Sequence, residues 1–407
     1  MNILNQWSGR LASQYPALGT HPVKIGKMFT PEYFELEKEK IFKKTWLNIA
    51  RQEEIPNAGD YIVRELEVCD TSVLIVRGED MKVRAFHNVC SHRLNRVAYE
   101  VKGNAKHFKC RFHSWTYGLD GSLTYLPQQD MFPGVERCDN GLTSIHCDTW
   151  EGFIFVNVDP APGETLREYI GEEFWDMYNG FMESKPLVGK LTVDVQCNWK
   201  ICLDAFCETY HFSTVHAKSA GGLVNSKANP FGFMDAVRLY DRHRSISTDS
   251  NPDHIPSFVE SLARKYTGGA SIAPDLSRGG KGLPPGLNPG KMKFWGSDII
   301  VLFPMAYLHP YMNFMTCQNY WPISHNRTRW EYMIHQSTPT SATHDVAAEF
   351  NRAIMRDVIR EDFMNLEWVQ SNLSSGAKKV QHLGDQEIML RHHYKVVSDF
   401  VGCGYWD

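Results

Sequence analysis

The sequence predicts an α+β fold, with a small all-β domain next to a larger domain of antiparallel strands and helices. Three observations predict it. Short β-rich runs with turn-like breaks fill the region before residue 160, three further strand patterns lie near residues 300 to 336, and a long helical pattern follows them. The expected domain ranges are 1–44, which packs on the larger domain, 45–158 and 159–407, the last boundary being marked by Pro-Ala-Pro-Gly at 160–163.

Length and composition fit an ordinary globular protein. The 407 residues are 43% hydrophobic and 22% charged, and the formal net charge of -4 gives no support for a nucleic-acid partner. The first residues lack the basic patch and apolar run of a signal peptide, and the longest apolar run, 299–308, is about half the length of a membrane helix. We therefore expect a cytoplasmic protein with no membrane partner, and we interpret the apolar run as a buried strand.

The first half of the chain predicts these elements in order. FTPEYFELEKEKIFKKTW has a Thr cap, a Pro in the first turn and apolar residues at helical spacing, which predicts a helix. YIVREL, SVLIVR and KVRAFH predict an antiparallel meander over 61–87, and GFIFVNVD predicts a strand over 152–159. A helical segment over 164–182, a strand and a helix carrying CETYHFSTVH, residues 207–216, are expected next.

The second half predicts a long loop, three strands and a long helix. Residues 219–291 show little periodicity and end in SRGGKGLPPGLNPGK, which we interpret as a mouth over a pocket or, alternatively, as a surface insertion. FWGSDIIVLF, MNFMTCQNYW and TRWEYMIHQS predict strands, and the pattern over 343–373 predicts a helix.

Two short loops in the all-β region each pair a cysteine with a histidine. Cys90-Ser-His92 is followed, after seventeen residues, by Cys110-Arg-Phe-His113. A zinc site would take all four side chains on one ion, whereas a Rieske [2Fe–2S] cluster places two cysteines on one iron and two histidines on the other. Mixed Cys/His loops among strands favour the cluster, because finger-type zinc sites group Cys with Cys and His with His. His107, between the loops, matches neither spacing.

Basic residues surround these loops, with Glu100 as the single acid. They are Arg93, Arg96, Lys102, Lys106, Lys109 and Arg111. Such a positive rim would steer an acidic electron donor toward the cluster. The alternative is a solvated loop with chance charge.

The stretch CETYHFSTVH indicates a second metal site. On a helix, Asp204, Glu208 and His211 would share one face. His216 would point away, so it can join His211 on one ion only if the helix ends or distorts at 213–215. Two histidines and one carboxylate with open positions describe a non-haem Fe(II) site.

The missing carboxylate is expected on the long helix. Its apolar stripe consists of Phe350, Ile354, Val358, Leu366 and Val369. The position absent from that series is Asp362, and a carboxylate that faces a core needs a cation. Glu361 is the alternative ligand, and a buried salt bridge to an arginine is the alternative role for Asp362.

In these two sets of residues, the chain resembles the large (α) subunit of a Rieske non-haem iron oxygenase, in the ring-hydroxylating oxygenase family. The resemblance covers nearly the whole chain and rests on C-x-H…C-x-x-H, on NWK at 198–200, on E-x-Y-H-x4-H over 208–216 and on E-D…VQ over 361–370. The chain departs from the family pattern at Leu94 and Ser114, where glycine is common, and at Asp204-Ala205, where Glu-Asn is usual.

The resemblance implies a Rieske domain inserted next to a helix-grip catalytic domain that binds mononuclear iron through His211, His216 and Asp362. It also implies a head-to-tail homotrimer, in which Glu208 bridges His211 of its own chain and His113 of the next. Glu208 and Asp204 are the candidate catalytic acids.

The implied function is that of a terminal oxygenase. It would use O2 together with electrons that come from NAD(P)H through a flavin reductase, a ferredoxin or both. The reaction would be dihydroxylation or monooxygenation of a hydrophobic substrate, expected to be aromatic, as in aromatic catabolism. N- or O-demethylation or quaternary-amine oxidation is the alternative, since aromatic side chains can cage a methylated ammonium. A pure electron carrier and a zinc hydrolase are the rival classes, and dependence on a small β subunit is left open.

The substrate pocket is expected to be apolar and aromatic. Its expected lining is Phe206, the 219–291 loop, Trp295, Ile300, Leu302, Met305, Tyr307 and Phe314.

Overall fold

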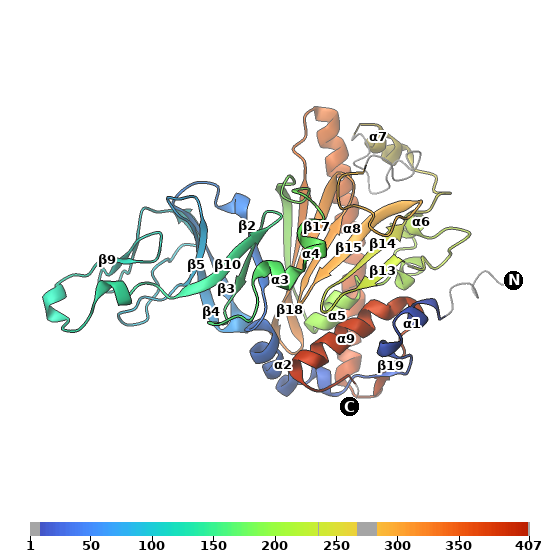
Figure 1. Cartoon of the computed structure of the whole chain (residues 1–407). Helices are drawn as coiled ribbons and strands as arrows, with labels where there is room; N and C mark the ends of the chain where they lie inside the picture. The colour runs from blue at the N-terminus through green and yellow to red at the C-terminus, as the bar shows by residue number, and fades with distance from the viewer. Residues whose placement is uncertain (1–8, 235, 267–282, 406–407) are drawn as a thin grey trace. The chain divides into compact units, whose positions relative to one another are not determined.

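The computed structural model describes residues 9–234, 236–266 and 283–405, which divide into two compact units (Figure 1). The small unit is Lys38–Trp175, and the large unit combines Met1–Glu37 with Asp176–Asp407. Helices and antiparallel sheets occur together, so the α+β prediction is confirmed. The sequence-based boundaries at 45 and 158 stay a prediction.

The small unit is built on strands, as its β-rich runs predict. One sheet has the order β2-β11-β10-β5-β4-β3-β6, and a second has the order β7-β8-β9. The bounds are β2 (Leu47–Arg51), β3 (Asp60–Leu66), β4 (Thr71–Arg77), β5 (Val83–His87), β6 (Lys102–Asn104), β7 (Phe108–Lys109), β8 (Thr116–Tyr117), β9 (Leu123–Tyr125), β10 (Ser144–Trp150) and β11 (Phe153–Asn157).

The helical segment expected over 164–182 is present only as two short helices in the small unit. They are α3 (Leu166–Ile170) and α4 (Glu172–Trp175). Gly171 ends α3 with a φ of 88°, a conformation that a glycine adopts without strain, and so interrupts the helical pattern.

The large unit is centred on one antiparallel sheet of order β12-β18-β17-β16-β15-β14-β13. The bounds are β12 (Leu187–Val195), β13 (Ala236–Leu239), β14 (Arg244–Asp249), β15 (Trp295–Leu302), β16 (Ala306–Pro310), β17 (Phe314–Ser324) and β18 (Arg327–Gln336). Strands β1 (Val23–Lys24) and β19 (Val380–Gln381) form a separate pair.

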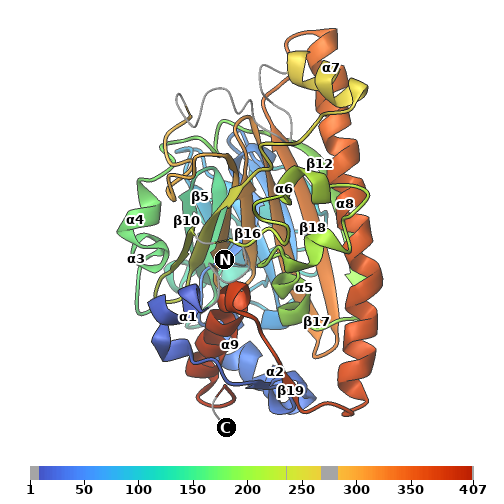
Figure 2. The same ribbon diagram turned by 90° about the vertical axis from the view of Figure 1, so that its right-hand side faces the viewer.

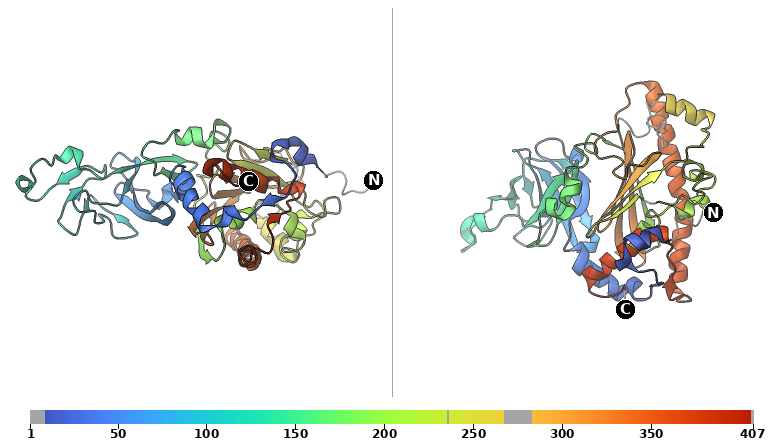
Figure 3. Two further views of the ribbon diagram at one scale, coloured as in Figure 1. Left: turned by 90° about the horizontal axis from the view of Figure 1, so that it is seen from below. Right: turned by 45° about the vertical axis from the view of Figure 1, so that its right-hand side comes forward.

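Helix α8 (Ala342–Ser374) runs lengthwise along this sheet, as Figures 2 and 3 show from different sides. Its bounds confirm the helix predicted over 343–373. The other helices of the unit are α1 (Arg10–Gln14), α2 (Pro31–Glu37), α5 (Trp199–Asp204), α6 (Gly221–Val224), α7 (Phe258–Tyr266) and α9 (Ile388–Val401). None of the helices in the described ranges has both the length and the apolar character needed to cross a membrane.

Two sequence-based expectations about this unit are wrong. The apolar run 299–308 is a hairpin rather than one strand, because β15 ends at Leu302 and Pro304, which has no N–H for a sheet, lies in the turn. Residues 219–291 are not a single loop, since α6, β13, β14 and α7 lie within them. The Gly-rich part of that segment, 267–282, lies outside the described residues.

The helix expected to carry 207–216, with an end or distortion at 213–215, is only partly correct. Helical geometry does end after Ser213, but no long helix leads up to it in the described chain. Helix α5 ends at Asp204, and only a short 3₁₀ helix, Tyr210–Ser213, follows. Side chains here bind the backbone: the Glu208 carboxylate accepts from the N–H of His211 at 3.2 Å, and the Thr209 hydroxyl donates to the carbonyl of Gly232. Such bonds compete with helical ones and favour an irregular chain.

Candidate functional site

Three side chains from separate segments of the large unit converge on one point. His211 lies in the 3₁₀ helix, His216 follows it by five residues, and Asp362 lies on the buried face of α8. One ligand atom from each lies within 4.8 Å of the others. The two Nε2 atoms are 3.2 Å apart, and Oδ1 of Asp362 is 3.3 Å from Nε2 of His216 and 3.6 Å from Nε2 of His211.

The remaining imidazole nitrogens are held by carboxylates. Nδ1 of His211 is hydrogen-bonded to Glu208, and Nδ1 of His216 lies 2.8 Å from Glu361. The hydroxyl of Ser219 donates to the same Glu361 carboxylate at 2.5 Å. Each ring is thereby oriented with Nε2 toward Asp362, the arrangement that metal-ligating histidines use. Glu361, the alternative ligand, contacts the opposite side of His216.

The buried carboxylate of Asp362 needs a cation close to it. Asp362 is 5% exposed, and its Oδ2 has no hydrogen-bond partner among the described residues. Its ion pairs are with His211 and His216, so the alternative of an arginine partner is not found in the part of the chain that is described. Burial alone would lower the pKa of His216, but the carboxylates of Asp362 and Glu361 hold that pKa above its ordinary value. Two imidazoles and one carboxylate fit a mononuclear iron.

Asp204 does not join this group. It ends α5, and its Oδ1 accepts a hydrogen bond from Nδ1 of His393 on α9 at 2.8 Å. Both side chains are buried. Burial lowers the pKa of His393 to about 4, so this ring is a neutral donor that fixes α9 to the end of α5.

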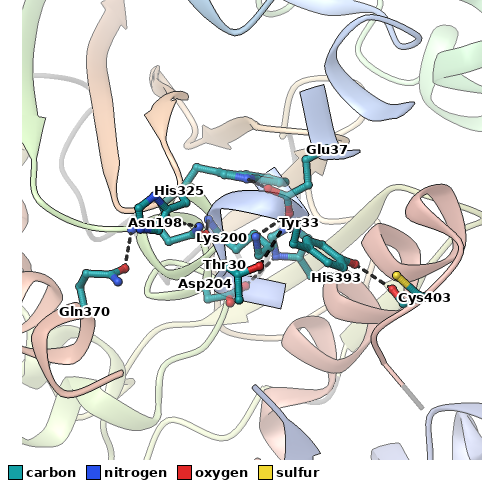
Figure 4. A network of polar contacts seen from close by, with 11 residues as sticks. Thr30, Tyr33, Glu37, Asn198, Lys200, Asp204, His325, Gln370, His393 and Cys403 are labelled. Carbon is teal, nitrogen blue, oxygen red and sulfur yellow. Dashed lines mark hydrogen bonds and ion pairs between the residues drawn. The ribbon is translucent and has the colours of Figure 1, made fainter. Parts of the chain in front are cut away.

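The NWK sequence anchors α5 to two other helices (Figure 4). Asn198 caps the helix by accepting from the N–H of Lys200 at 2.9 Å, and its own N–H donates to Gln370 of α8 at 2.9 Å. Nζ of Lys200 lies 2.5 Å from the carboxylate of Glu37 on α2. Two motifs far apart in sequence thus meet in one network, which ties α5 to the helix that carries Asp362.

The two Cys/His loops of the small unit have the same backbone turn. The N–H of Leu94 donates to the carbonyl of Cys90 at 3.1 Å, and that of Ser114 donates to the carbonyl of Cys110 at 2.9 Å. Leu94 and Ser114 have φ values of 59° and 63°, in the left-handed region. Glycine adopts this region without strain, which explains why glycine is common at these two positions.

In these two loops, like side chains lie close together. The rings of His92 and His113 have their centroids 4.4 Å apart, and the thiols of Cys90 and Cys110 interact. Nδ1 of His92 is buried and has no hydrogen-bond partner among the described residues, whereas His107, which lies between the two loops in sequence, is exposed. Two thiols and two imidazoles with a buried, unpaired nitrogen fit a Rieske [2Fe–2S] cluster.

The surroundings affect the two thiols differently: burial raises the pKa of Cys90, whereas neighbouring N–H groups favour the thiolate of Cys110. Burial would raise the pKa of Cys110, but the backbone N–H groups of Phe112 and His113 bring that pKa below its ordinary value. The hydroxyl of Tyr117 accepts from the N–H of Ser91 at 3.0 Å and lies 3.2 Å from the sulfur of Cys90.

A cavity adjoins His211, His216 and Asp362. One wall is apolar and comes from helical segments: Leu223, Val224, Met355, Val358 and Ile359. The other wall comes from strands and from Tyr311, directly after β16: Ser297, Ile299, Tyr307, His309, Tyr311, Thr316, Gln318 and Tyr332. No lysine or arginine lines the cavity among the described residues.

The expected lining is only partly correct. Phe206 and Tyr307 line the cavity, as do several residues of the 219–291 segment. The residues that do not line it are Trp295, Ile300, Leu302, Met305 and Phe314. Alternate residues of a strand face opposite sides, and β15 and β16 present Ile299 and His309 to the cavity instead. The polar residues His309 and Gln318 could not have been identified from the sequence except by this alternation.

A second cavity lies on the other side of the same group. Glu208, His211 and Asp362 line it together with Asp204 and residues of α9. The candidate metal site therefore lies between two cavities.

Both units match known protein families. Residues 45–138 match the Rieske [2Fe-2S] domain, and residues 183–402 match the ring hydroxylating alpha subunit (catalytic domain). The chain is 34% identical to the biphenyl 2,3-dioxygenase subunit alpha of Rhodococcus jostii over 197 residues, which are 46% of this chain and 42% of that protein. It is 32% identical to the carnitine monooxygenase oxygenase subunit of Escherichia coli K12 over 213 residues, 52% of each chain.

The chain spans about half the length of these curated relatives. Among solved structures, a quaternary ammonium Rieske monooxygenase superposes with a TM-score of 0.73 at 20% identity, covering 95% of this chain and 97% of that chain. This likeness concerns the fold.

Proposed function

Because this chain belongs to the ring-hydroxylating oxygenase alpha-subunit family and carries a Rieske [2Fe–2S] domain, we propose that it is the terminal component of an oxygenase system. Its substrate would be a small hydrophobic compound held in the cavity beside His211, His216 and Asp362. The observation that carries this proposal is the buried Asp362 carboxylate, which faces two imidazoles and has one oxygen without a partner among the described residues.

The cofactors of the family are the Rieske cluster and a mononuclear iron. We assign the cluster to Cys90, His92, Cys110 and His113. We assign the iron to His211, His216 and Asp362. When bound, the iron supplies oxygen activation, with electrons that arrive through the cluster.

The protein's own groups hold and orient the iron ligands. Glu208 and Glu361 keep Nδ1 of each histidine engaged, so that Nε2 faces the iron position. The apolar helical wall limits the access of water to the cavity, which strengthens the electrostatic interactions within it.

The electron donor is proposed to be an acidic ferredoxin or a flavin reductase. In the small unit, Arg96 is paired with Glu65 at 2.7 Å, and Arg111 lies 3.4 Å from Glu100. The basic side chains in this region with no carboxylate in contact among the described residues are Arg93, Lys102, Lys106 and Lys109. Their net positive charge supports steering of an acidic partner.

The assembly is proposed to be a homotrimer in which electrons pass between chains. Glu208 binds His211 and also lines the second cavity, which leaves it accessible from the side away from the substrate cavity. A neighbouring chain's His113 would reach Glu208 from that side. Asp204, as the partner of His393, would be a positioning residue.

Two substrate classes fit the cavity. Aromatic side chains in its lining suit a ring compound, and the same side chains suit a methylated ammonium. They are Phe206, Phe212, Tyr307, Tyr311 and Tyr332. Hydroxylation of an aromatic compound is the main proposal, and demethylation or quaternary-amine oxidation is the alternative.

The proposal is tested with Asp362→Ala and a surrogate reductase under ¹⁸O2, using a panel of arenes, aryl ethers and N-methyl amines. The wild type should incorporate ¹⁸O into a product or release formaldehyde. Asp362→Ala should keep a reducible cluster, lose about one of roughly three iron atoms per chain and form no product. Asp357→Ala, at an exposed acid on the same helix, is the control and should behave as the wild type.

Product formation by Asp362→Ala at the wild-type rate would contradict the proposal. Full redox activity with no product from either protein would point to an electron carrier. A colourless zinc protein without sulfide would point to a hydrolase.

A further inference from the structure

The sheet wall of the substrate cavity carries a chain of hydrogen bonds centred on His309. Nε2 of His309 lies 2.8 Å from the hydroxyl of Ser297, which lies 2.8 Å from the hydroxyl of Thr248. Nδ1 of His309 lies 3.3 Å from the hydroxyl of Tyr307 and 3.2 Å from that of Tyr311. All five residues line the cavity.

The direction of each hydrogen bond follows from the number of protons available. The hydroxyl of Thr248 donates to the backbone carbonyl of Ser297 at 3.0 Å, so its oxygen accepts from the hydroxyl of Ser297. Ser297 has then used its only proton and must accept from Nε2–H of His309. Burial lowers the pKa of His309 to about 3, which makes the ring neutral and leaves Nδ1 with a lone pair.

This assignment leaves one phenol with no strong acceptor. Nδ1 of His309 has a single lone pair, but the hydroxyls of Tyr307 and Tyr311 both lie within reach of it. Among the described residues, the other acceptor near these two hydroxyls is the sulfur of Met355, which lies 3.9 Å from the hydroxyl oxygen of Tyr311. A thioether is a weak acceptor. One of these two O–H groups is therefore available to a bound molecule.

A second donor lies on the neighbouring strand. Gln318 stands opposite Tyr307 in the register of β16 and β17, and its side-chain oxygen accepts from Tyr320 at 2.6 Å. This bond occupies the side-chain oxygen of Gln318. The side-chain amide nitrogen has no hydrogen-bond partner within the described ranges. The wall thus offers donors from two strands.

We propose that this donor wall, Tyr307, His309, Tyr311 and Gln318, recognises a hydrogen-bond acceptor on the substrate. The substrate is then a hydrophobic ring compound that bears a neutral acceptor oxygen, such as a ketone or an ether. A carboxylate is disfavoured, because the cavity has no lysine or arginine in its described lining and already contains Asp362 and Glu208. This inference rests on the proposed function, in that it takes this cavity as the substrate site.

Binding of a matched pair of probes to the iron-loaded protein tests the inference. Acetophenone carries a carbonyl oxygen, and α-methylstyrene has the same shape with a methylene in its place. Calorimetric titration should find acetophenone bound about three- to tenfold more tightly by the wild type, since a net hydrogen bond is gained.

The variants Tyr307→Phe and Tyr311→Phe make the test specific. In each one, the remaining hydroxyl donates to Nδ1 of His309, so neither phenol is left in surplus. The preference should therefore fall, with the Gln318 amide as the remaining donor. The double variant should lose little more than either single variant, because His309 leaves only one of these two phenols in surplus. Tyr405→Phe, which removes a buried hydroxyl bound to the carbonyl of Leu18, should keep the wild-type preference.

Equal affinities for the two probes in the wild type, no binding of acetophenone, or a preference that both single variants retain would each overturn the inference. Equal affinities with ¹⁸O-labelled product from both probes would refute the donor wall and leave the oxygenase function intact. A clear preference with no product from either probe would support the donor wall and count against the oxygenase function.

Discussion

Leu94 occupies a backbone conformation that costs a leucine free energy. Its φ of 59° is left-handed, and its side chain is 77% exposed beside Cys90 and His92, so little packing offsets the strain. An L-residue in this region costs about 1–2 kcal/mol, whereas glycine loses about 0.5–1 kcal/mol through the entropy of the unfolded chain. A strained, exposed apolar residue beside the proposed cluster ligands is expected to have a functional reason, such as contact with a partner.

We therefore expect Leu94→Gly to leave the free energy of unfolding of the small unit unchanged or to raise it by up to about 1 kcal/mol. Leu191→Gly, at a leucine that is 38% exposed within β12, should lower the free energy of unfolding of the large unit by about 1 kcal/mol or more. Denaturant unfolding measures both values. A similar loss in both variants would contradict the strain argument.

Asp298 is a buried acid that should make stability depend on pH. Burial raises its pKa from 3.8 to about 6, although the N–H groups of Asn288 and Trp295 donate to the carboxylate at 2.8 and 2.9 Å. The folded state therefore favours the protonated form. The resulting stabilisation is fully present below pH 3.8 and is lost as the pH rises through about 6.

Asp298→Asn, which stays neutral, should not lose this contribution. Relative to that variant, the wild type should lose about 2 kcal/mol of unfolding free energy between about pH 4.5 and pH 7.5. Denaturant titrations of both proteins at the two pH values measure the difference. The same difference at both pH values would show that Asp298 does not titrate in this range.

Helices α2 and α5 are joined by an ion pair with no exposure to water. Glu37 and Lys200 are both 0% exposed, and Nε1 of Trp199 also donates to the Glu37 carboxylate at 3.0 Å. Burial raises the pKa of Glu37 and lowers that of Lys200, so each charge depends on the other. Removing one partner of a buried pair leaves an uncompensated charge, whereas removing both does not.

Lys200→Met should accordingly destabilise the large unit by about 3–5 kcal/mol, and the double variant Glu37→Met/Lys200→Met should recover most of that loss. Lys395→Met, which breaks an exposed pair with Asp399 on α9, should cost about 0.5 kcal/mol or less. Denaturant unfolding of the four proteins provides the comparison. A double variant as unstable as Lys200→Met would mean that packing, rather than charge, controls this contact.

Periodic elements could be predicted from the sequence, and irregular ones could not. Helix α8 follows a local pattern, which placed Asp362 on its buried face correctly. The predicted stripe is off by one position at both ends. Asn351 and Met355 are buried in place of Phe350 and Ile354, and Gln370 is buried against Asn198 in place of the exposed Val369. That contact joins residues 172 positions apart, so no local pattern reports it.

The backbone path around His211 and His216 could not be predicted in detail from sequence periodicity either. Side-chain bonds to the backbone end the helix there, and the same bonds orient the two rings. Helix α9 was missed as well, although its His393 fixes Asp204. Residue types and spacing were enough to identify the candidate ligands, but the groups that orient them come from distant segments.

The two compact units should unfold in separate transitions. Each has its own sheet, and the candidate iron residues and the candidate cluster residues lie in different units. A metal that binds only folded protein stabilises the unit that holds it. Loss of the iron should therefore lower one calorimetric transition and leave the other in place.

We expect an Fe(II) chelator to lower the transition of the large unit by roughly 5–15 °C. Cys90→Ser should lower only the other transition. Differential scanning calorimetry of the wild type, of Cys90→Ser and of His211→Ala separates the two effects, since the chelator should not change His211→Ala. A single transition that shifts in every sample would contradict independent unfolding.

The residues proposed to bind iron and those proposed to select the substrate come from different kinds of element. His211 lies in a 3₁₀ helix, His216 in the turn after it and Asp362 on α8. The donor wall instead comes from β16, from Tyr311 directly after it, and from β17. A substitution at a cavity-facing strand position changes one side chain and leaves the backbone register and the iron residues as they were. After gene duplication, single substitutions in this wall could thus change the substrate range of one copy. The residues proposed to bind iron would stay the same in both copies.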